Sequence, residues 1–444
     1  MSTSEAGTFP EEWPVEPLRR SLLSAVDGPF GSNLTSAHYV DDGARVIRLG
    51  NLGIGAFKDK DKAYISLEHF ETLKGHSVAA GDLLVAGLGD ENNPLGRASL
   101  APASIEPAIV KADCFRLRLI PGRYDPRFVV WYLTSTPGQQ QTLLKSHGST
   151  RQRMNVQDVQ SLLVPRPSLD EQRRIADFLN AETARIDELV ETQTELSDLL
   201  RERRQSVAFA EVTGCTTDEL RPSGLAWTDQ LPSTWMTTKL SFVARMGSGH
   251  TPSRSRPEWW TDCTIPWITT GEVAQVRDDR REVINETREM ISRLGMANSS
   301  AELHPQHTVV LCRTASAGYS GVMGRPMATS QDFVTWTCTS KLDPFYLLWC
   351  LRAMRSDLLG RLAMGSTHKT IYVPDLQMLK IPLPPVAEQR AIVERIRQAH
   401  RVIDELTDSV NSQLALLAER RQALITAAVT GQLDVTTARG ADLS

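Results

Sequence analysis

The sequence predicts an α+β protein in which two mixed α/β domains are separated by two long antiparallel coiled-coil helices. Three features of the 444-residue chain support this prediction: a gapless internal repeat, a stretch of more than 40 residues without Pro or Gly inside each copy, and short apolar runs before each copy. The length alone allows two to four structural units. We therefore expect an internal duplication with pseudo-twofold symmetry.

The repeat relates residues 148–214 to residues 365–431 at a constant offset of 217, and 27 of the 67 aligned positions are identical. Both copies begin with Gly-Ser-Thr, continue through Pro-x-Pro and Glu-Gln-Arg, and close with Val-Thr-Gly. A gapless match of this extent indicates a duplicated structural unit. The predicted organisation is a first domain (1–147), a first repeat (148–214), a second domain (215–364), a second repeat (365–431) and a C-terminal tail (432–444).

Each repeat predicts one long helix with defined ends. Ser168 and Glu171 have the spacing of a capping box at the start of the first helix. Pro384 and Pro385 suit the start of the second helix, where a missing N–H costs nothing. Gly214 and Gly431 fit the left-handed position just past a helix end. About 40 residues at 1.5 Å each give helices roughly 60 Å long.

Apolar residues recur at seven-residue spacing along both helices, interrupted by Gln193 in the first and uninterrupted in the second, which is the pattern of a coiled-coil seam. Two such seams in one chain most simply pair with each other. The alternative is that each helix packs on its own domain, although a helix of roughly 60 Å outgrows a domain of about 140 residues. The predicted seam residues are Leu179, Ile186, Leu200 and Val207 in the first helix and Ile396, Ile403, Val410, Leu417 and Leu424 in the second.

The segments that precede the two helices correspond more loosely. A Pro-x-x-Trp pattern opens both, with Trp13 in the first and Trp235 in the second. Short apolar runs bounded by turn residues predict strands at 44–48, 82–85, 265–268 and 308–311. Two domains that share a framework and differ inside it suggest two similar modules that bind different things.

The composition sets limits on the class of protein. The N-terminus lacks the layout of a signal peptide, no apolar stretch approaches the roughly 20 residues that span a bilayer, and the six cysteines form no C-x-x-C pair. We expect a cytoplasmic protein. The net charge of −4 is unusual for a DNA-binding protein, but residues 168–214 carry eleven acids and six arginines, so the rest of the chain sums to about +1.

Motifs for catalysis are missing. The sequence contains no G-x-x-x-x-G-K-[ST] phosphate loop, which argues against ATP chemistry. His304 and His307 flank a proline that breaks the geometry of a helical metal site, so we expect a surface role for them. Ser149 and Ser366 lack a fixed His or Asp partner in the repeat, so nucleophilic catalysis has no support. We expect a chain that is not an enzyme and holds no metal.

Several loops are instead rich in side chains that contact nucleic acid. Gly-Ser-Thr followed by cations suits phosphate contacts, which set register rather than sequence, and Arg, Asn, Ser and His in loops can reach base edges. An ordinary polar loop remains the alternative for each. The candidate DNA-binding residues are Ser32, Asn33, Arg48 and Arg97 in the first domain, Ser149, Thr150, Arg151 and Arg153 in the first repeat, His250, Arg254, Arg256 and Arg313 in the second domain, and Ser366, Thr367, His368 and Lys369 in the second repeat.

These motifs together resemble the specificity subunits of Type I restriction–modification systems over nearly the whole chain. The resemblance rests on Pro-x-x-Trp, the Gly28-Pro-Phe-Gly-Ser32 turn, the Gly-Ser-Thr loops and the Pro-x-Pro to Glu-Gln-Arg helix starts. The second domain departs from it, because Met246-Gly-Ser-Gly249 replaces the first domain's Gly-Pro-Phe-Gly-Ser turn.

The resemblance implies that each domain reads one half of a split, asymmetric target in double-stranded DNA. It further implies that the helices set the spacing and dock two methyltransferase subunits, that restriction/translocase subunits join the complex, and that S-adenosylmethionine, ATP and Mg²⁺ act on those partners rather than on this chain. Two alternatives remain from the residues alone. One is a coiled-coil scaffold without DNA readout, and the other is a fused methyltransferase or nuclease, against which the missing catalytic motifs count.

Overall fold

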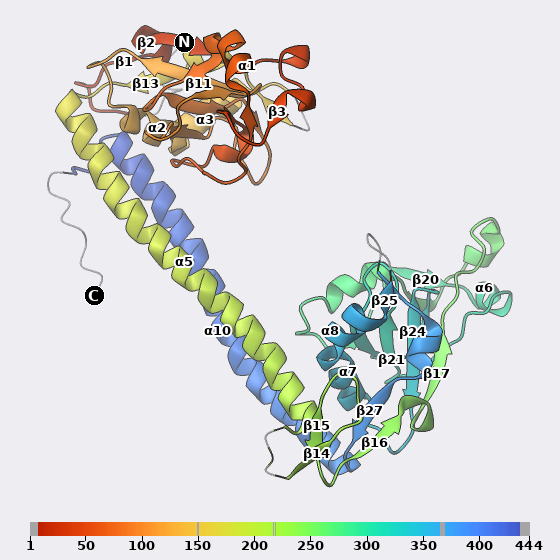
Figure 1. Ribbon diagram of the computed structural model, residues 1–444. Helices are drawn as coiled ribbons and strands as arrows, with labels where there is room; N and C mark the ends of the chain where they lie inside the picture. Colours follow the sequence, from red (N-terminus) through yellow and green to blue (C-terminus); the bar gives the residue numbers. More distant parts are fainter. Residues whose placement is uncertain (1–7, 149–150, 216, 218, 365–368, 436–444) are drawn as a thin grey trace. The chain divides into compact units, whose positions relative to one another are not determined.

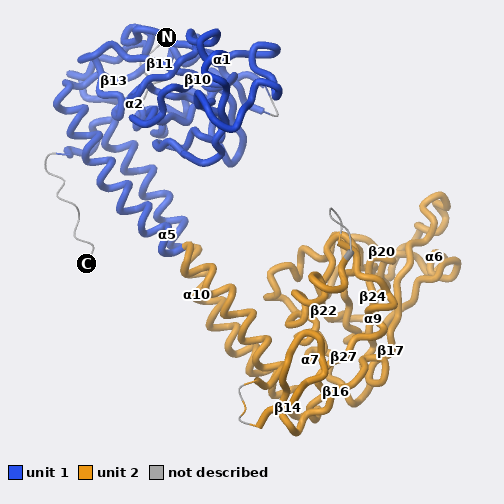
Figure 2. The backbone as a smooth tube through the Cα atoms, in the orientation of Figure 1, with its two compact units in different colours: residues 1–193, 412–444 blue, residues 194–411 orange. Residues whose placement is uncertain are grey.

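The computed structural model describes residues 8–148, 151–215, 217, 219–364 and 369–435 (Figure 1). They form two compact units, each treated separately below: unit 1 comprises 1–193 and 412–444, and unit 2 comprises 194–411 (Figure 2). The long helices α5 (Leu169–Thr213) and α10 (Val386–Val429) each contribute one segment to each unit. The predicted α+β fold with two mixed domains and two long helices is confirmed.

Unit 1 contains two main sheets. The central sheet has the order β2 (Leu22–Val26), β11 (Cys114–Leu119), β7 (Leu83–Ala86) and β9 (Ala98–Leu100), and all of its pairings are antiparallel. The second sheet has the order β3 (Tyr39–Val40), β5 (Tyr64–Ile65), β4 (Ala44–Ile47), β10 (Ala108–Val110) and β6 (Ser77–Val78). Two small ladders pair β1 (Val15–Pro17) with β13 (Leu163–Pro165) and β8 (Leu88–Gly89) with β12 (Gln152–Arg153).

Short helices pack against the sheets of unit 1, with α2 and α4 on the central sheet and α1 on the second sheet. Helix α2 begins where the Asp125 carboxylate accepts a hydrogen bond from the Arg127 N–H, with Pro126 in its first turn. Its residues Phe128 to Thr134 are buried, which explains why this stretch of the sequence is apolar on all sides. The short helices are α1 (Leu67–Thr72), α2 (Pro126–Thr134), α3 (Thr136–Leu144) and α4 (Val156–Gln160).

Unit 2 repeats this layout with different detail. Its central sheet has the order β17 (Ala244–Ser248), β24 (Phe333–Cys338), β21 (Val309–Cys312), β22 (Ser320–Met323) and β19 (Val283–Ile284). A three-stranded sheet has the order β20 (Glu289–Ile291), β18 (Ile265–Ile268) and β23 (Ala328–Thr329). The remaining ladders pair β14 (Leu220–Pro222) with β15 (Gln230–Pro232), β16 (Met236–Lys239) with β27 (Lys380–Leu383), and β25 (Ala363–Met364) with β26 (Thr370–Ile371).

The helices of unit 2 match those of unit 1 in place and capping. Helix α7 (Pro344–Ala353) follows Asp343, whose carboxylate accepts hydrogen bonds from the N–H groups of Phe345 and Tyr346, as the Asp125 carboxylate does from the Arg127 N–H at the start of α2. The other short helices are α6 (Arg293–Ala297), α8 (Arg355–Asp357), a π-helical turn at Leu358–Leu362 and α9 (Val373–Gln377). The four predicted strand segments correspond to β4, β7, β18 and β21.

In each unit the start of one long helix packs against the end of the other, so the two segments run antiparallel. Leu179 of α5 shares the buried core of unit 1 with Ile425 of α10. Ile396 of α10 shares the core of unit 2 with Val212 of α5. Of the predicted seam residues, Leu179, Ile186, Ile396, Ile403 and Val410 are buried, and Leu200, Val207, Leu417 and Leu424 are half-buried.

The repeated motifs join each helix start to its domain. The buried Gln172 side chain accepts a hydrogen bond from the Asp125 N–H at 2.8 Å and donates to the Pro167 carbonyl at 2.8 Å. Gln389, its equivalent at an offset of 217, accepts from the Asp343 N–H at 2.8 Å. The Gln of the Glu-Gln-Arg motif is therefore a structural joint that fixes a domain helix to its long helix.

The helix ends are equally specific. Gly214 and Gly431 have φ values of 59° and 73°, the left-handed conformation that the sequence predicts after each helix. A Cβ atom on Gly214 would lie 3.0 Å from the Trp235 ring, and one on Gly431 would lie 3.2 Å from the Trp13 ring. The Pro-x-x-Trp motif at the start of each domain therefore packs against the Val-Thr-Gly end of the long helix that follows the other domain.

Candidate nucleic-acid interface

One end of the central sheet in unit 1 gathers three loops. Because β2, β11 and β7 alternate in direction, the end of β2, the start of β11 and the end of β7 meet at the same edge. The Asp27 carboxylate ties two of the loops together by accepting hydrogen bonds from Gly28 N at 2.7 Å and Asp113 N at 2.9 Å. Gly87 N donates to the Asp113 carbonyl at 2.8 Å, which attaches the third loop.

Residues 151–154 of the first repeat lie at the same edge. Strand β12 (Gln152–Arg153) pairs with β8 just after β7, and Met154 N donates to the Gly87 carbonyl at 3.0 Å. The Arg153 guanidinium donates to the Asp113 carboxylate at 3.0 Å and stays 58% exposed. Arg151 is exposed. The candidates Ser149 and Thr150 lie outside the described residues.

The remaining candidates of the first domain differ in their surroundings. Ser32 and Asn33 are exposed on the 3-10 turn Gly31–Asn33, which follows β2 and the Gly28 turn. The ring of His69 donates to the Asn33 carbonyl at 3.0 Å and so fixes this turn to α1. Arg48 is half-buried and forms an ion pair with Asp61.

Arg97 does not present its guanidinium to solvent. It is 5% exposed, and its nitrogens donate to five carbonyl oxygens at 2.8–3.3 Å, those of Leu49, Leu52, Leu88, Asn93 and Pro94. Burial lowers the pKa of this guanidinium. The expectation of a DNA contact at Arg97 is therefore corrected: its guanidinium is hydrogen-bonded to backbone carbonyls, three of which also accept a backbone N–H.

Unit 2 builds an equivalent edge from the end of β17, the end of β21 and the start of β24. The His250 side chain is exposed, and its backbone N–H donates to the Thr329 carbonyl at 3.0 Å. The half-buried Arg313 donates through Nε to the Gln331 carbonyl at 3.0 Å, and Thr251 Oγ1 donates to the Gln331 side chain at 2.5 Å. The loop around Gln331 thus brings His250 and Arg313 together.

The second repeat reaches this edge as the first repeat does in unit 1. Ile371 N donates to the Arg313 carbonyl at 2.8 Å. Lys369 is exposed and its ammonium lies 3.4 Å from the Leu359 carbonyl. The candidates Ser366, Thr367 and His368 lie outside the described residues.

Two glycines allow the loops to approach at equivalent points. A Cβ atom on Gly28 would lie 2.0 Å from the Lys111 carbonyl carbon, and one on Gly249 would lie 2.2 Å from the Thr329 and Ser330 oxygens. Any side chain there would push apart the loops before β11 and β24. The two turns, at 28–32 and 246–249, differ in sequence, but each therefore contains a glycine that lets it pack closely against the neighbouring loop.

Arg254 and Arg256 lie apart from this edge, before the 3-10 turn Pro257–Trp260. Arg254 stacks 3.9 Å from the Trp260 ring centre and pairs with Glu289 at 2.5 Å. Arg256 lies 3.8 Å from Glu258, and both of its neighbours in sequence are exposed. Each of these two arginines is therefore paired with an acidic residue of the same unit.

The electrostatics of the edge in unit 1 are mixed rather than uniformly basic. Burial raises the pKa of Asp27 to about 6, although its two backbone hydrogen bonds act in the opposite direction. Asp113 has a left-handed φ of 66° and holds Arg153. Sequence reasoning missed Asp27, Asp113, Thr251 and Gln331, and their position in polar loops next to strands was the one available signal.

His304, expected at the surface, is 1% exposed and packs within 3.4 Å of the Thr335 hydroxyl. This expectation was wrong because the ring packs against Thr335 of β24 and Gly247 of β17. Among the described residues, no group of three or more His, Cys, Asp or Glu side chains is arranged to hold a metal ion. No helix within the described ranges is long and apolar enough to cross a membrane.

Comparisons with known proteins agree with this architecture. Residues 232–416 match the family described as Type I restriction modification DNA specificity domain. The chain is 22% identical to the Type I restriction enzyme EcoBI specificity subunit of Escherichia coli, over 94% of this chain and 86% of that protein. It is 21% identical to the StySPI specificity subunit of Salmonella potsdam, over 96% of this chain and 90% of that protein.

A solved structure shares the fold. A chain from a study of complex assembly and conformational transition of the type I R-M system superposes with a TM-score of 0.73 at 20% identity, over 96% of this chain and 99% of that one. The duplicated helices, the paired domains and the near full-length relatives point the same way. Over nearly its whole length the chain is similar to the specificity subunits of Type I restriction–modification systems, and residues 232–416 match their DNA specificity domain.

Proposed function

We propose that this chain reads a split, asymmetric DNA target, with each unit contacting one half-site through the loop cluster at the end of its central sheet. The observation that carries the proposal is the equivalence of the two clusters. In both units the same three strand ends and the same repeat loop meet at one edge. Their exposed side chains differ, with Ser32 and Asn33 in unit 1 and His250 in unit 2.

Different side chains on one framework suit an asymmetric target. Hydroxyl, amide and imidazole groups can read base edges, whereas exposed cations such as Arg151 and Lys369 suit phosphates, which carry no sequence information. The twofold character of the duplication suits two half-sites separated by helical turns of DNA. Because α5 is acidic and α10 has no net charge, partner subunits would supply much of the phosphate neutralisation.

We further propose that the helices dock two methyltransferase subunits at two equivalent positions. Leu189 and Leu416 are 42% and 63% exposed in unit 1, and their repeat equivalents Leu406 and Leu199 are 51% and 61% exposed in unit 2. All four are leucines retained in both copies of the repeat. Large apolar side chains exposed at matched positions are typical of a binding surface that is used twice.

The rest of the complex follows from the family resemblance. Restriction/translocase subunits would join the assembly, S-adenosylmethionine would bind the methyltransferase subunits, and ATP and Mg²⁺ would act in the translocase. This chain would then need no cofactor of its own. The complex would act in the cytoplasm, where the six free cysteines would remain reduced.

The test is detection of modified bases by long-read sequencing in cells that express this chain with its neighbouring methyltransferase, beside cells that lack this chain alone. We expect a split, asymmetric methylated motif that requires the chain. Replacing Ser32 and Asn33 by Ala should alter one half of the motif only, and replacing His250 by Ala should alter the other half only. Identical methylation with and without the chain, in a complex that still assembles, would favour a scaffold and exclude the proposal.

A further inference from the structure

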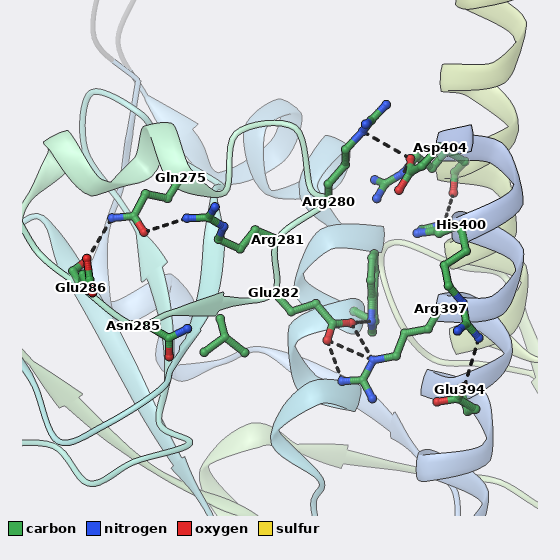
Figure 3. A pocket seen from close by; sticks show the side chains of 14 residues that line it. Gln275, Arg280, Arg281, Glu282, Asn285, Glu286, Glu394, Arg397, His400 and Asp404 are labelled. Carbon is green, nitrogen blue, oxygen red and sulfur yellow. Dashed lines mark hydrogen bonds and ion pairs between the residues drawn. The ribbon is translucent and has the colours of Figure 1, made fainter. Parts of the chain in front are cut away.

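A short segment of the second domain, residues 278–282, lies in contact with both long helices of unit 2. It borders a cleft of about 770 Å³ that is lined by side chains from the domain and from α5 and α10 (Figure 3). Glu282 points across this cleft to Arg397 of α10. The two groups form three contacts of 2.6–3.2 Å, and the Trp349 ring N–H donates to the same carboxylate at 2.8 Å.

Arginines on both sides of the cleft hold the rest of the segment to the helices. Arg204 of α5 donates to the Asp279 carbonyl at 3.0 Å and to the Asp404 carboxylate of α10 at 3.0 Å. Arg280 reaches outward to Asp408 of α10, with an ion-pair distance of 2.7 Å. The segment therefore contacts α5 through its backbone and α10 through two side chains.

Two arginines of the domain also bind the same segment, from the side opposite the helices. Arg352 of α7 is 7% exposed and donates to the carbonyls of Asp279 at 2.8 Å and Arg281 at 2.7 Å. The Arg355 guanidinium donates two hydrogen bonds of 2.7 Å to the Asp279 carboxylate. Asp279 itself has a left-handed φ of 59°. Burial lowers the pKa of Arg352 to about 10, so the group stays charged at neutral pH.

Unit 1 joins its domain to the helices differently at the equivalent positions. Asn180 stands where the offset of 217 places Arg397, and it accepts directly from the Trp131 ring N–H at 3.0 Å. The helix-to-helix pair is shared, because Arg421 and Asp187 repeat Arg204 and Asp404. The helices are thus alike where they meet each other and different where they meet their domains.

We propose that segment 278–282 and its ion pairs, with Glu282–Arg397 as the principal one, form a clamp that fixes the orientation of the second recognition domain and so makes the complex discriminate spacer length. This role rests on the function proposed above. One base pair more or less in a spacer turns a half-site by roughly 35° and moves it by about 3.4 Å. Reorienting the domain to follow it would break the Glu282, Arg280 and Arg204 contacts together. Arg397 is on this account a positioning residue that touches no base.

The test uses the complex with its methyltransferase and DNA substrates that carry both half-sites with spacers of the natural length and one base pair longer or shorter. Arg397→Asn installs the residue that unit 1 has at this position. Arg401→Asn is the matched control, since Arg401 is 69% exposed one turn further along α10 and lies 3.6 Å from Glu394 rather than against the segment. Arg397→Lys keeps the charge and shows whether a partly restored pair partly restores selectivity.

We expect the unaltered complex and Arg401→Asn to methylate the natural spacer alone. Arg397→Asn should methylate the altered spacers to within about tenfold of the natural one, with the base preference of both half-sites unchanged. An unchanged spacer profile in a folded Arg397→Asn complex overturns the proposal. So does a changed base preference at the second half-site, since that would make Arg397 part of the readout.

Amide hydrogen exchange decides the structural half of the proposal independently of methylation. Exchange across residues 278–284 should be faster in Arg397→Asn than in Arg401→Asn, because the segment loses its tie to α10. Equal exchange in the two variants overturns the clamp even in a complex that methylates nothing. A clamp that loosens in a complex without target-dependent methylation would instead refute the proposed function alone.

Discussion

Replacing Arg97 by Met separates a structural arginine from one that contacts DNA. The substitution keeps the length and apolar stem of the side chain and removes the donors that now serve five carbonyl oxygens. Leaving a buried carbonyl oxygen without a donor costs about 1–3 kcal/mol, so two such groups cost about 2–6 kcal/mol. For a unit of about 200 residues, in which 1 kcal/mol shifts Tm by about 2–4 °C, the transition of unit 1 should fall by about 4–24 °C.

The assay is thermal unfolding, with peptide-resolved hydrogen exchange to assign the transition to unit 1. Arg151→Met provides the control, because Arg151 is an exposed cation of the same unit. Arg97→Lys should recover little, since an ammonium group cannot reach acceptors that lie in the several directions of a guanidinium fork. Unchanged unfolding of Arg97→Met together with weaker DNA binding would refute the structural role and restore the original expectation of a DNA contact.

Three further outcomes are expected. Arg153→Gln should weaken DNA binding about equally for all sequences and lower the salt slope by about 1, as measured by titration at several salt concentrations; a change confined to one sequence would contradict a phosphate contact. Inserting four residues in one long helix adds about 6 Å, so the spacer in the methylated motif should grow by one or two base pairs, and an unchanged spacer would exclude the helices as a ruler. Burial lowers the pKa of His400 to about 4, below its value of roughly 6.5 in the unfolded chain, so His400 favours folding fully above pH 6.5 and less as pH falls towards 4. Between pH 7.5 and 5.5 this loss is about 1.3 kcal/mol for unit 2, and His400→Thr, which copies Thr183 of unit 1, should unfold with a weaker pH dependence; equal pH profiles would contradict it.

The long helices could be predicted from the sequence almost to the residue because their signals are local. The Ser168 hydroxyl accepts from the Glu171 N–H at 3.3 Å, as the predicted cap requires, and Gly214 ends α5 in the left-handed conformation. The seven-residue spacing of apolar positions also depends on the helix alone. Local sequence therefore determines where these elements begin, end and present their apolar face.

Arg97 and the clamp at 278–282 could not be predicted in the same way. An arginine in a polar loop has the same local sequence whether it reaches solvent or carbonyls 45 residues away, as Arg97 does with Leu52. Glu282 and Arg397 are 115 residues apart, and the topology of unit 2 alone brings them together. For the same reason, residue types alone identified the candidate loops. That these loops lie together at one edge of the sheet follows only from the order of the strands.

The exchange of helix ends between the two units has a consequence for synthesis. Unit 2 is one continuous stretch, whereas the core of unit 1 includes Ile425 and Val429 from the last part of the chain. At 5–20 residues per second, a ribosome that has passed residue 193 needs about 10–50 s to reach them. Until then Ile175 and Leu179 lack part of their apolar cover, so the domain made first is the one completed last. We expect released chains that end at residue 411 to hold a folded unit 2 beside a first domain that binds chaperones.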